Sequence, residues 1–554
     1  MSNQNLYSAL RAAFPKTLDD IAIETDHGLC YSWRDLDRAS AMIANLFEDL
    51  GIPAHSRVAV QVEKSVEALI LYLATLRAGH VFLPLNTAYQ SAEIEYFVGN
   101  AEPAVVVCSG KNFGWVSKIA FQAGTRHVFT LNEDRTGTLL DRAAVQSDQH
   151  KPVHRNADDL AAILYTSGTT GRSKGAMLSH GNLHSNAAML KDYWGWVPGD
   201  VLIHALPIFH VHGLFVAIHG AMLNGSKMLW HAKFDPKRVI ADMPRATVFM
   251  GVPTLYVRML AEPALNRQAV ANMRLFIAGS APLLIETFQE WQERTGHTIL
   301  ERYGMSETIM LTSNPYRADA RYAQASERRG GTVGFPLPGV SLRVRDDAGQ
   351  DCAVEDIGGI QVKGPNVFSG YWRMPEKTAE EFTSDGFFKT GDVGKVDARG
   401  YVTIVGRSKD LIISGGYNVY PAEIEGFVAD KAADKAARDS SKALEDASKN
   451  ADKAADDASK NAENAQKAYD KADKNAQDAE QTAKDADKEA NEANKENDKV
   501  KNDKNSTEKQ KEVAQKNADK AEAKKKAANE SKAKADDSKT KAEQANKDAK
   551  TAEK

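Results

Sequence analysis

Cysteine is scarce in this sequence, which holds only Cys30, Cys108 and Cys352. Three widely spaced thiols exclude a disulfide framework and a cysteine-rich zinc site, and they are typical of a reducing compartment. Apolar runs of membrane-spanning length are missing, and the first residues lack the basic and apolar segments of a signal peptide. The formal net charge of −4 gives no reason to expect nucleic acid or an anionic membrane as a partner. We therefore expect a soluble, cytoplasmic protein.

Glycine, proline and aromatic residues are missing from the last part of the chain. No glycine follows Gly426, no proline follows Pro421, and Tyr469 is the single aromatic residue after Phe427. The preceding residues have the mixed composition of a globular protein and are numerous enough for more than one hydrophobic core. Residues 429–554 contain equal numbers of acidic and basic side chains and form a separate low-complexity segment.

Alanines in this segment recur at the spacing of a helix seam. They alternate steps of four and three residues, the a/d pattern of a coiled coil, at Ala472, Ala476, Ala479, Ala483, Ala486, Ala490 and Ala493. The register breaks around residues 502–506. Alanine is the strongest helix former but buries little area, so we expect a long helix or frayed helices that self-associate weakly as a coiled coil. Disorder is the alternative, because hydrophobicity is low and the charge is mixed.

The first 160 residues read as alternating strands and helices. Apolar β-branched runs predict strands over 58–62, 81–85 and 104–108, and the amphipathic stretch 66–77 predicts a helix between the first two. This alternation predicts an α/β fold of packed sheets and helices.

A string rich in glycine and hydroxyl groups runs from Leu164 to Gly175 and follows an apolar run that predicts a buried strand. Glycines let backbone N–H groups approach an anion, hydroxyls add donors, and Lys174 adds a positive charge. The spacing differs from that of a Walker loop. The chemistry predicts a polyphosphate-binding loop, and a flexible turn between two elements is the alternative.

This string resembles the phosphate-binding signature of the adenylate-forming superfamily, which contains acyl-CoA synthetases, luciferases and the adenylation domains of peptide synthetases. Further strings resemble family motifs in the family's order, at 205–213, 249–258, 279–282, 301–308, 389–392, 406–410 and 414–425. The resemblance covers residues 1–428. It implies an AMP-binding adenylation domain over 1–405 and a hinge with a remnant of the small C-terminal domain over 406–428, followed by the tail 429–554.

The resemblance also implies ATP and Mg²⁺ binding and assigns roles to residues of these strings. Glu307 would bind the metal, Lys409 would be the hinge, and Gly415 with Gly416 would line the CoA tunnel. The implied catalytic residues are Thr166, Lys174, Glu307 and Thr308. The implied ATP-binding residues are Thr166, Ser167, Gly168, Thr169, Thr170, Gly171, Lys174, Gly279, Tyr303, Thr308, Asp392 and Arg407.

The acid substrate is predicted from an arginine. Arg258 lies in a string that resembles the malonyl-CoA synthetase branch, in which it would hold the second carboxylate of malonate, with His210 and Ser280 lining the acyl pocket. A guanidinium suits a carboxylate because the two pair through parallel hydrogen bonds. The alternative is a surface arginine, which would make the chain a general ligase for monocarboxylates.

The resemblance ends where the small domain should continue. Family members carry about a hundred further residues there, with a lysine that bridges the carboxylate and the α-phosphate, whereas this sequence enters the alanine-rich tail. We therefore expect impaired adenylation and impaired transfer to CoA. A non-catalytic nucleotide-binding head on a helical stalk is the alternative from another functional class.

Overall fold

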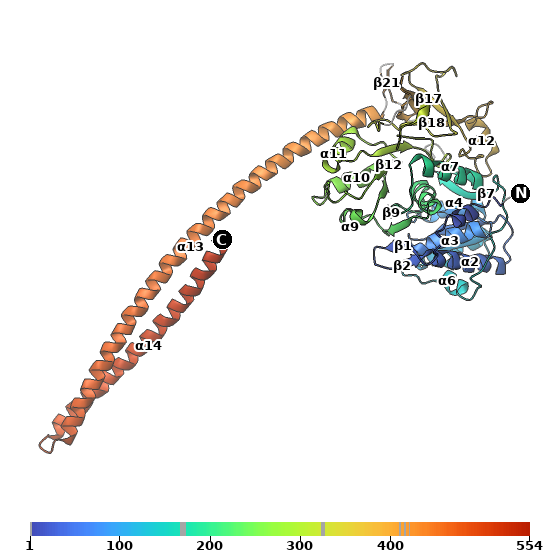
Figure 1. The fold of residues 1–554 in the computed structure, drawn as a ribbon. Coiled ribbons are helices and arrows are strands. Elements are labelled where there is room, and N and C mark those ends of the chain that lie inside the picture. The colour runs from blue at the N-terminus through green and yellow to red at the C-terminus, as the bar shows by residue number, and fades with distance from the viewer. Residues whose placement is uncertain are drawn as a thin grey trace. The chain divides into compact units, whose positions relative to one another are not determined.

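The computed structural model describes residues 3–166, 173–322, 327–408, 412–414, 417–419 and 421–553. Contacts divide the chain into two compact units, Met1–Gly426 and Phe427–Lys554. The described sheets belong to the first unit, and the second is helical (Figure 1). No helix in the described ranges is both long enough and apolar enough to cross a membrane.

One sheet of the first unit has six strands in the order β6-β5-β3-β4-β7-β8 within the described residues. Its strands are parallel except β8, which forms a hairpin with β7. The three strands predicted in this region form, each within one residue of the expected start. The strand bounds are β3 Arg57–Gln61, β4 Val81–Pro84, β5 Val105–Cys108, β6 His127–Thr130, β7 Leu160–Thr166 and β8 Lys174–Ser179.

A second sheet has nine strands among the described residues, in the order β15-β14-β13-β12-β11-β9-β10-β1-β2. Its centre is parallel, and β2, β14 and β15 are added antiparallel at the two edges. The strand bounds are β1 Ile21–Thr25, β2 Cys30–Ser32, β9 Val201–His204, β10 Lys227–Trp230, β11 Val248–Gly251, β12 Leu275–Ala278, β13 Leu300–Tyr303, β14 Thr312–Ser313 and β15 Phe335–Pro336.

Two smaller antiparallel sheets follow along the chain. The four-stranded one consists of β16 Ser341–Arg345, β17 Gly358–Lys363, β18 Phe388–Val396 and β19 Val402–Arg407, and the two-stranded one of β20 Ile412–Ser414 and β21 Tyr417–Val419. The predicted mixed α/β fold is thus confirmed, and its parallel strands end at the loops that carry the motif residues.

The helices of the first unit surround these sheets (Figure 1). The predicted helix over 66–77 forms with those bounds as α3, and all of its residues are buried because it packs inside the main core. The helix bounds are α1 Leu6–Ala12, α2 Trp33–Asp49, α3 Val66–Arg77, α4 Ser91–Ala101, α5 Phe113–Gln122, α6 Thr138–Ala143, α7 His180–Tyr193, α8 His219–Leu223, α9 Pro236–Asp242, α10 Pro253–Leu260, α11 Ile285–Thr295 and α12 Pro375–Glu381. A π-helix spans His212–Ile218.

The tail forms two helices, α13 Pro421–Asn502 and α14 Glu508–Glu553, which lie antiparallel and side by side (Figure 1). The side-chain amide of Asn494 contacts Glu522 at 2.7 Å, and that of Asn497 contacts Gln515 at 2.9 Å. The turn between the helices falls at the predicted break in the alanine register. The helical prediction is confirmed and disorder is not, whereas self-association between chains stays a prediction.

Candidate active site

A cavity of about 710 Å³ lies in the first unit, where the six-stranded and nine-stranded sheets bring the carboxyl ends of parallel strands together. Such ends are where open α/β sheets bind ligands, because the loops that follow them are free to carry polar groups. Thr166 ends β7, Ser280 follows β12, and Arg302 lies in β13. The small sheet adds Thr390, Gly391 and Arg407, and α12 adds Lys377 and Glu381.

Lys174 is the first residue of β8 and lines this cavity. Its Nζ lies 3.3 Å from Oε1 of Glu381 and 4.3 Å from the centre of the Tyr371 ring. Thr166 faces it across the hairpin, where its hydroxyl donates to the Lys174 carbonyl at 3.4 Å. The predicted phosphate-binding residues between them, Ser167, Gly168, Thr169, Thr170 and Gly171, lie outside the described residues.

Glu307 is buried in the cavity wall. The Tyr371 hydroxyl donates to its Oε1 at 2.9 Å, and burial raises the pKa of the Glu307 carboxyl. Thr308 is fully buried behind it, and its hydroxyl accepts a hydrogen bond from the Met305 N–H at 3.3 Å. A carboxylate that faces a cavity with one neutral partner is suited to a cation that also holds phosphate oxygens.

Tyr303, Asp392 and Arg407 come together at the end of β13. The Tyr303 hydroxyl donates to one oxygen of Asp392, and Arg407 Nε lies 3.2 Å from the other. Three residues to which the resemblance assigns ATP binding are therefore neighbours in space. The family roles of these groups stay predictions.

Arg302 is a buried cation in the wall of the cavity, and no motif assigned it a role. Among the residues that the structure describes, none is a hydrogen-bond partner of its three guanidinium nitrogens, although Arg302 is only 2% exposed. Burial lowers its pKa to about 9, so it is still charged at neutral pH. The neighbouring Glu301 neutralises this charge only weakly, because burial raises the pKa of its carboxyl to about 8.

The backbone leaves room for this guanidinium. A Cβ at Gly279 would lie 2.6 Å from the Arg302 guanidinium, so only glycine permits the close approach. Ser280 follows with φ +72° and lines the cavity, with its hydroxyl 3.4 Å from Nδ1 of His212. His210 also lines the cavity. Hydroxyl, imidazole and guanidinium thus converge on one part of the wall, and such a set suits an anion.

The structure does not place Arg258 in this cavity. Its side chain is exposed on α10 and its guanidinium lies 4.8 Å from the centre of the Phe234 ring. The buried face of the helix is formed by Pro253, Tyr256, Met259 and Leu260. Arg258 lies on the opposite side, because residues of one helix face recur every three or four positions. The prediction that Arg258 points into the acyl pocket is therefore wrong for this structure.

A signal for Arg302 was present in the sequence. It stands inside a short apolar-flanked strand, between Glu301 and Tyr303, and a charged side chain in a buried strand needs a partner. The motif drew attention to its neighbours instead.

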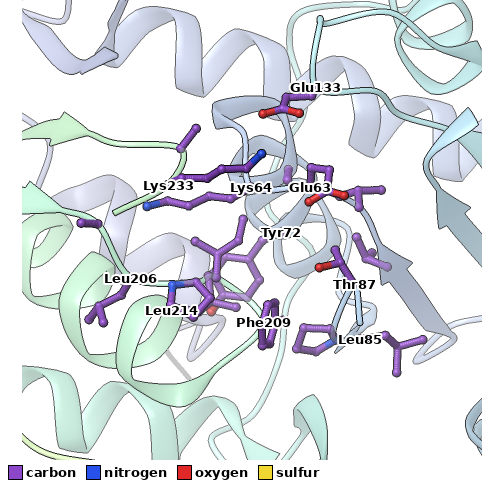
Figure 2. Close-up of a pocket in the computed structure, with 18 of the residues that line it drawn as sticks. Glu63, Lys64, Tyr72, Leu85, Thr87, Glu133, Leu206, Phe209, Leu214 and Lys233 are labelled. Atoms are coloured by element: carbon purple, nitrogen blue, oxygen red, sulfur yellow. The ribbon is translucent and has the colours of Figure 1, made fainter. Parts of the chain in front are cut away.

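A second cavity, of about 390 Å³, has mostly apolar walls. In Figure 2, Leu206, Phe209 and Leu85 lie in the lower part of the view, and Lys64, Lys233 and Glu133 lie in the upper part. Lys64 is held by the carbonyls of His204 at 2.9 Å and His231 at 2.6 Å. A cavity of about 50 Å³ shares wall residues with both larger cavities, among them Phe209 with the second and His210 with the first.

Three further predicted residues lie outside the described residues: the hinge Lys409 and the CoA-tunnel pair Gly415 and Gly416. In the described part of the chain no group of three or more His, Cys, Asp or Glu side chains is arranged to hold a metal ion.

Comparison with known proteins agrees with this arrangement. Residues 10–372 match the AMP-binding enzyme family. A malonate–CoA ligase of Arabidopsis thaliana is 33% identical over 461 residues, which cover 76% of this chain and 74% of that one. The crystal structure of ATP-bound MatB from Rhodopseudomonas palustris is 54% identical, with a TM-score of 0.73 over 76% of this chain and 82% of that one.

A malonyl-CoA ligase ternary product complex with methylmalonyl-CoA and AMP bound is 34% identical, with a TM-score of 0.61 over 76% of this chain and 85% of that one. The family match spans more than half of the chain, and two of these relatives are named as malonate–CoA or malonyl-CoA ligases. The chain belongs to the AMP-binding enzyme family, as an adenylate-forming enzyme of the acyl-CoA ligase type.

Proposed function

We propose that the chain activates malonate in two steps. A carboxylate oxygen of malonate attacks the α-phosphorus of ATP, the bond to pyrophosphate breaks, and malonyl-AMP forms. The thiol of CoA then attacks the acyl carbon, and AMP leaves as malonyl-CoA forms. The unpaired guanidinium of Arg302 is the observation that carries the choice of a dicarboxylate. The names of the relatives support the same substrate.

The nucleotide would occupy the half of the cavity formed by the motif residues. Thr166 and Lys174 would bind the phosphates together with Ser167 to Gly171, while Tyr303, Asp392 and Arg407 would hold adenine and ribose. Glu307 fits a magnesium ion that is shared with phosphate oxygens, since magnesium bound to a nucleotide commonly uses one or two protein carboxylates. Such an ion would screen the charge of the departing pyrophosphate. Thr308 would orient the α-phosphate through its backbone or hydroxyl.

The acid would lie between the nucleotide and Arg302. One carboxylate reacts, and the second pairs with the guanidinium, with Ser280, His210 and His212 around it. A monocarboxylate would leave the buried guanidinium without a partner, which is costly in a site from which water is excluded. Specificity then follows from pairing, because a site built around one charge rejects ligands that lack its complement. Positioning and charge stabilisation supply the acceleration.

The apolar cavity of Figure 2 is suited to the uncharged arm of CoA. Its small neighbour shares residues with the nucleotide cavity, so a thiol entering there would arrive next to His210. Gly415 and Gly416 would complete this path.

Catalysis by this 554-residue chain should be impaired. Residues 429–554 stand where the family resemblance implies a lysine-bearing small domain, and the lysines of the tail have no glycine or proline context that resembles that motif. Loss of one charge-stabilising donor slows enzymes by roughly 10²–10³-fold, and we expect adenylation to fall by at least this factor. Thioester formation should fall further.

Malonate-dependent exchange of pyrophosphate into ATP tests the proposal, with acetate as the control acid. We expect slow exchange with malonate and none with acetate. Arg302→Met should reduce the malonate-dependent rate by about a hundredfold or more, because the second carboxylate would be buried without a partner. Arg258→Ala is the matched control and should stay within about twofold, since it removes an exposed arginine.

Equal exchange with acetate and malonate would exclude the dicarboxylate and point to a general ligase. Retained ATP binding by Arg302→Met, measured by calorimetry, would show that the variant is folded and that its loss concerns the acid.

A further inference from the structure

Two charged residues of the cavity wall belong to none of the motifs that carry the proposed function. Lys377 and Glu381 both lie on α12 and both line the 710 Å³ cavity. Nζ of Lys377 and Nζ of Lys174 each lie 3.3 Å from the same oxygen, Oε1 of Glu381. One carboxylate oxygen therefore contacts two ammonium groups, and one of these belongs to the Leu164–Gly175 string.

The local structure holds this cluster in place. Lys377 and Glu381 are four positions apart on α12, so they share one face of the helix. The helix is tied to Tyr371, whose backbone N–H donates to the Thr378 hydroxyl at 2.9 Å. The Tyr371 ring lies against Lys174 and its hydroxyl binds Glu307. A connected set of groups thus runs from the expected magnesium ligand to Lys377.

The side chains of Lys174 and Glu381 are each 20% exposed, and that of Lys377 is 38% exposed. Glu381 divides its single negative charge between the two ammonium groups, and Lys377 has one further carboxylate partner, the exposed Glu380 at 2.7 Å. A phosphate group offers several oxygens and more negative charge than a carboxylate, so it would bind both lysines better than Glu381 does. The same site cannot hold Glu381 and a phosphate on the two lysines at once, because like charges at contact repel.

We propose that Lys174 and Lys377 form the seat of the leaving pyrophosphate and that Glu381 is its built-in competitor. Lys377 is then a phosphate-binding residue outside the motif loop. Glu381 neutralises the two lysines when no phosphate is bound, moves aside when it binds, and recaptures them as pyrophosphate leaves. The proposal rests on the proposed function for the identity of the leaving group. It adds a second lysine and a device that limits product affinity.

A purely structural role of the Glu381 ion pair predicts the opposite change in pyrophosphate affinity when the charge of Glu381 is removed. If Glu381 only fixed Lys174 in position for phosphate, its removal would weaken the binding of pyrophosphate or leave it unchanged. A competitor predicts tighter binding, because the lysines no longer have to give up a carboxylate. The direction of the change separates the two readings without any assay of turnover.

The experiment is a calorimetric titration of the full chain with inorganic pyrophosphate, without acid, ATP or CoA. Glu381→Gln keeps the shape of the side chain and removes its charge, and we expect pyrophosphate to bind about three- to tenfold more tightly, as for a half-buried ion pair. Lys377→Met should weaken binding by a similar factor. Glu380→Gln is the matched control and should stay within about twofold.

Glu380 suits this purpose because it lies on the same helix and pairs with Lys377 at 2.7 Å, but its side chain is 65% exposed and, among the described residues, the ion pair of Lys174 is with Glu381 instead. Equal effects of the two glutamine variants would mean that net charge, and not the shared carboxylate, sets the affinity, and would overturn the proposal. Unchanged or weaker binding by Glu381→Gln, or no effect of Lys377→Met, would overturn it as well.

The titration contains no malonate, so its result is independent of the acid. Failure of malonate-dependent exchange alongside tighter binding by Glu381→Gln would remove the proposed substrate and leave the pyrophosphate seat intact. Normal malonate-dependent exchange, together with unchanged pyrophosphate affinity in Glu381→Gln, would support the proposed substrate and overturn the pyrophosphate seat.

Discussion

The buried side chains of the two units differ greatly in size. The first unit buries large aromatic residues, and Trp33, Trp194, Trp230 and Trp291 are among its least exposed side chains. The second buries alanines, with Ala483, Ala486 and Ala528 forming a small cluster between α13 and α14. A buried tryptophan or phenylalanine side chain removes several times more apolar area from water than a methyl group does. Stability per residue should therefore differ strongly between the units.

The two units also differ in how strongly their packing selects one arrangement of side chains. In the first unit, irregular aromatic shapes interlock, as where Phe276 and Tyr256 meet Trp291 with ring centres 4.9 Å apart. In the helical pair, a seam of identical methyl groups hardly distinguishes one register from another. Polar contacts between the helices do distinguish registers, such as Asn497 with Gln515 and Lys524 with Glu489. Only the first kind of packing can hold a buried, unpaired group such as Arg302 in one position.

The largest expected effect is that of a cavity in the aromatic core. Phe276 is fully buried on β12, and Phe276→Ala should lower the free energy of unfolding of the first unit by about 3–5 kcal/mol. Denaturant unfolding followed by tryptophan fluorescence measures this unit alone, because every tryptophan precedes residue 427. Val257→Ala, at an exposed position of α10, is the control and should change little. A loss below about 1 kcal/mol for Phe276→Ala would show that the core repacks around the gap.

The sequence predicted the positions of helices and strands in both units better than it predicted which elements pack against each other. Strand and helix periods located β3, β4, β5 and α3, because each period reports burial of one element by itself. The break in the alanine register located the turn after α13. The same register did not predict that α14 packs on α13 of the same chain. A seam of alanines identifies the apolar face of a helix, but it does not identify the helix that packs against that face.

For the residues of the candidate site as well, the sequence predicted which segments take part better than it predicted the surroundings of each side chain. Motif strings identified Lys174, Glu307 and Asp392, and the structure brings these segments to one cavity. The arginine was chosen wrongly, because Arg258 precedes Met259 on a helix that looked apolar throughout, and its direction depends on which face packs inward. The string of Arg302 shows a charged residue in a buried strand, but its lack of a partner is visible only when the surrounding loops are assembled.

A second, smaller effect concerns the pH dependence of the first unit. Burial raises the pKa of Glu301 to about 8, above the value of about 4.5 in the unfolded chain, so the folded state binds the extra proton between these values. Stability from this group is complete below pH 4.5 and is lost as the pH rises toward 8, by up to about 4 kcal/mol. Glu301→Gln should remove this slope, measured as unfolding free energy at pH 5, 6.5 and 8 by tryptophan fluorescence.

Glu290→Gln serves as the control for that measurement, because Glu290 is exposed on α11 and should leave the slope unchanged. A slope that survives in Glu301→Gln would mean that other buried groups, and not Glu301, carry the pH dependence of this unit.

The smallest effect is expected in the alanine seam, where neighbouring residues form a matched pair. Ala528 is buried between the helices and Ala527 is exposed on the same turn of α14. Glycine costs about 1 kcal/mol in either place through helix propensity, and Ala528→Gly should cost about 0.8 kcal/mol more through its lost methyl contact. Thermal melting of both variants, followed by the helical signal in far-ultraviolet circular dichroism at several protein concentrations, measures these losses.

Equal losses in the two variants would mean that the seam contributes no packing energy, and a midpoint that rises with concentration would reveal association between chains. Tryptophan fluorescence should report the same unfolding of the first unit in both variants, because the packing that positions Arg302 does not depend on this seam.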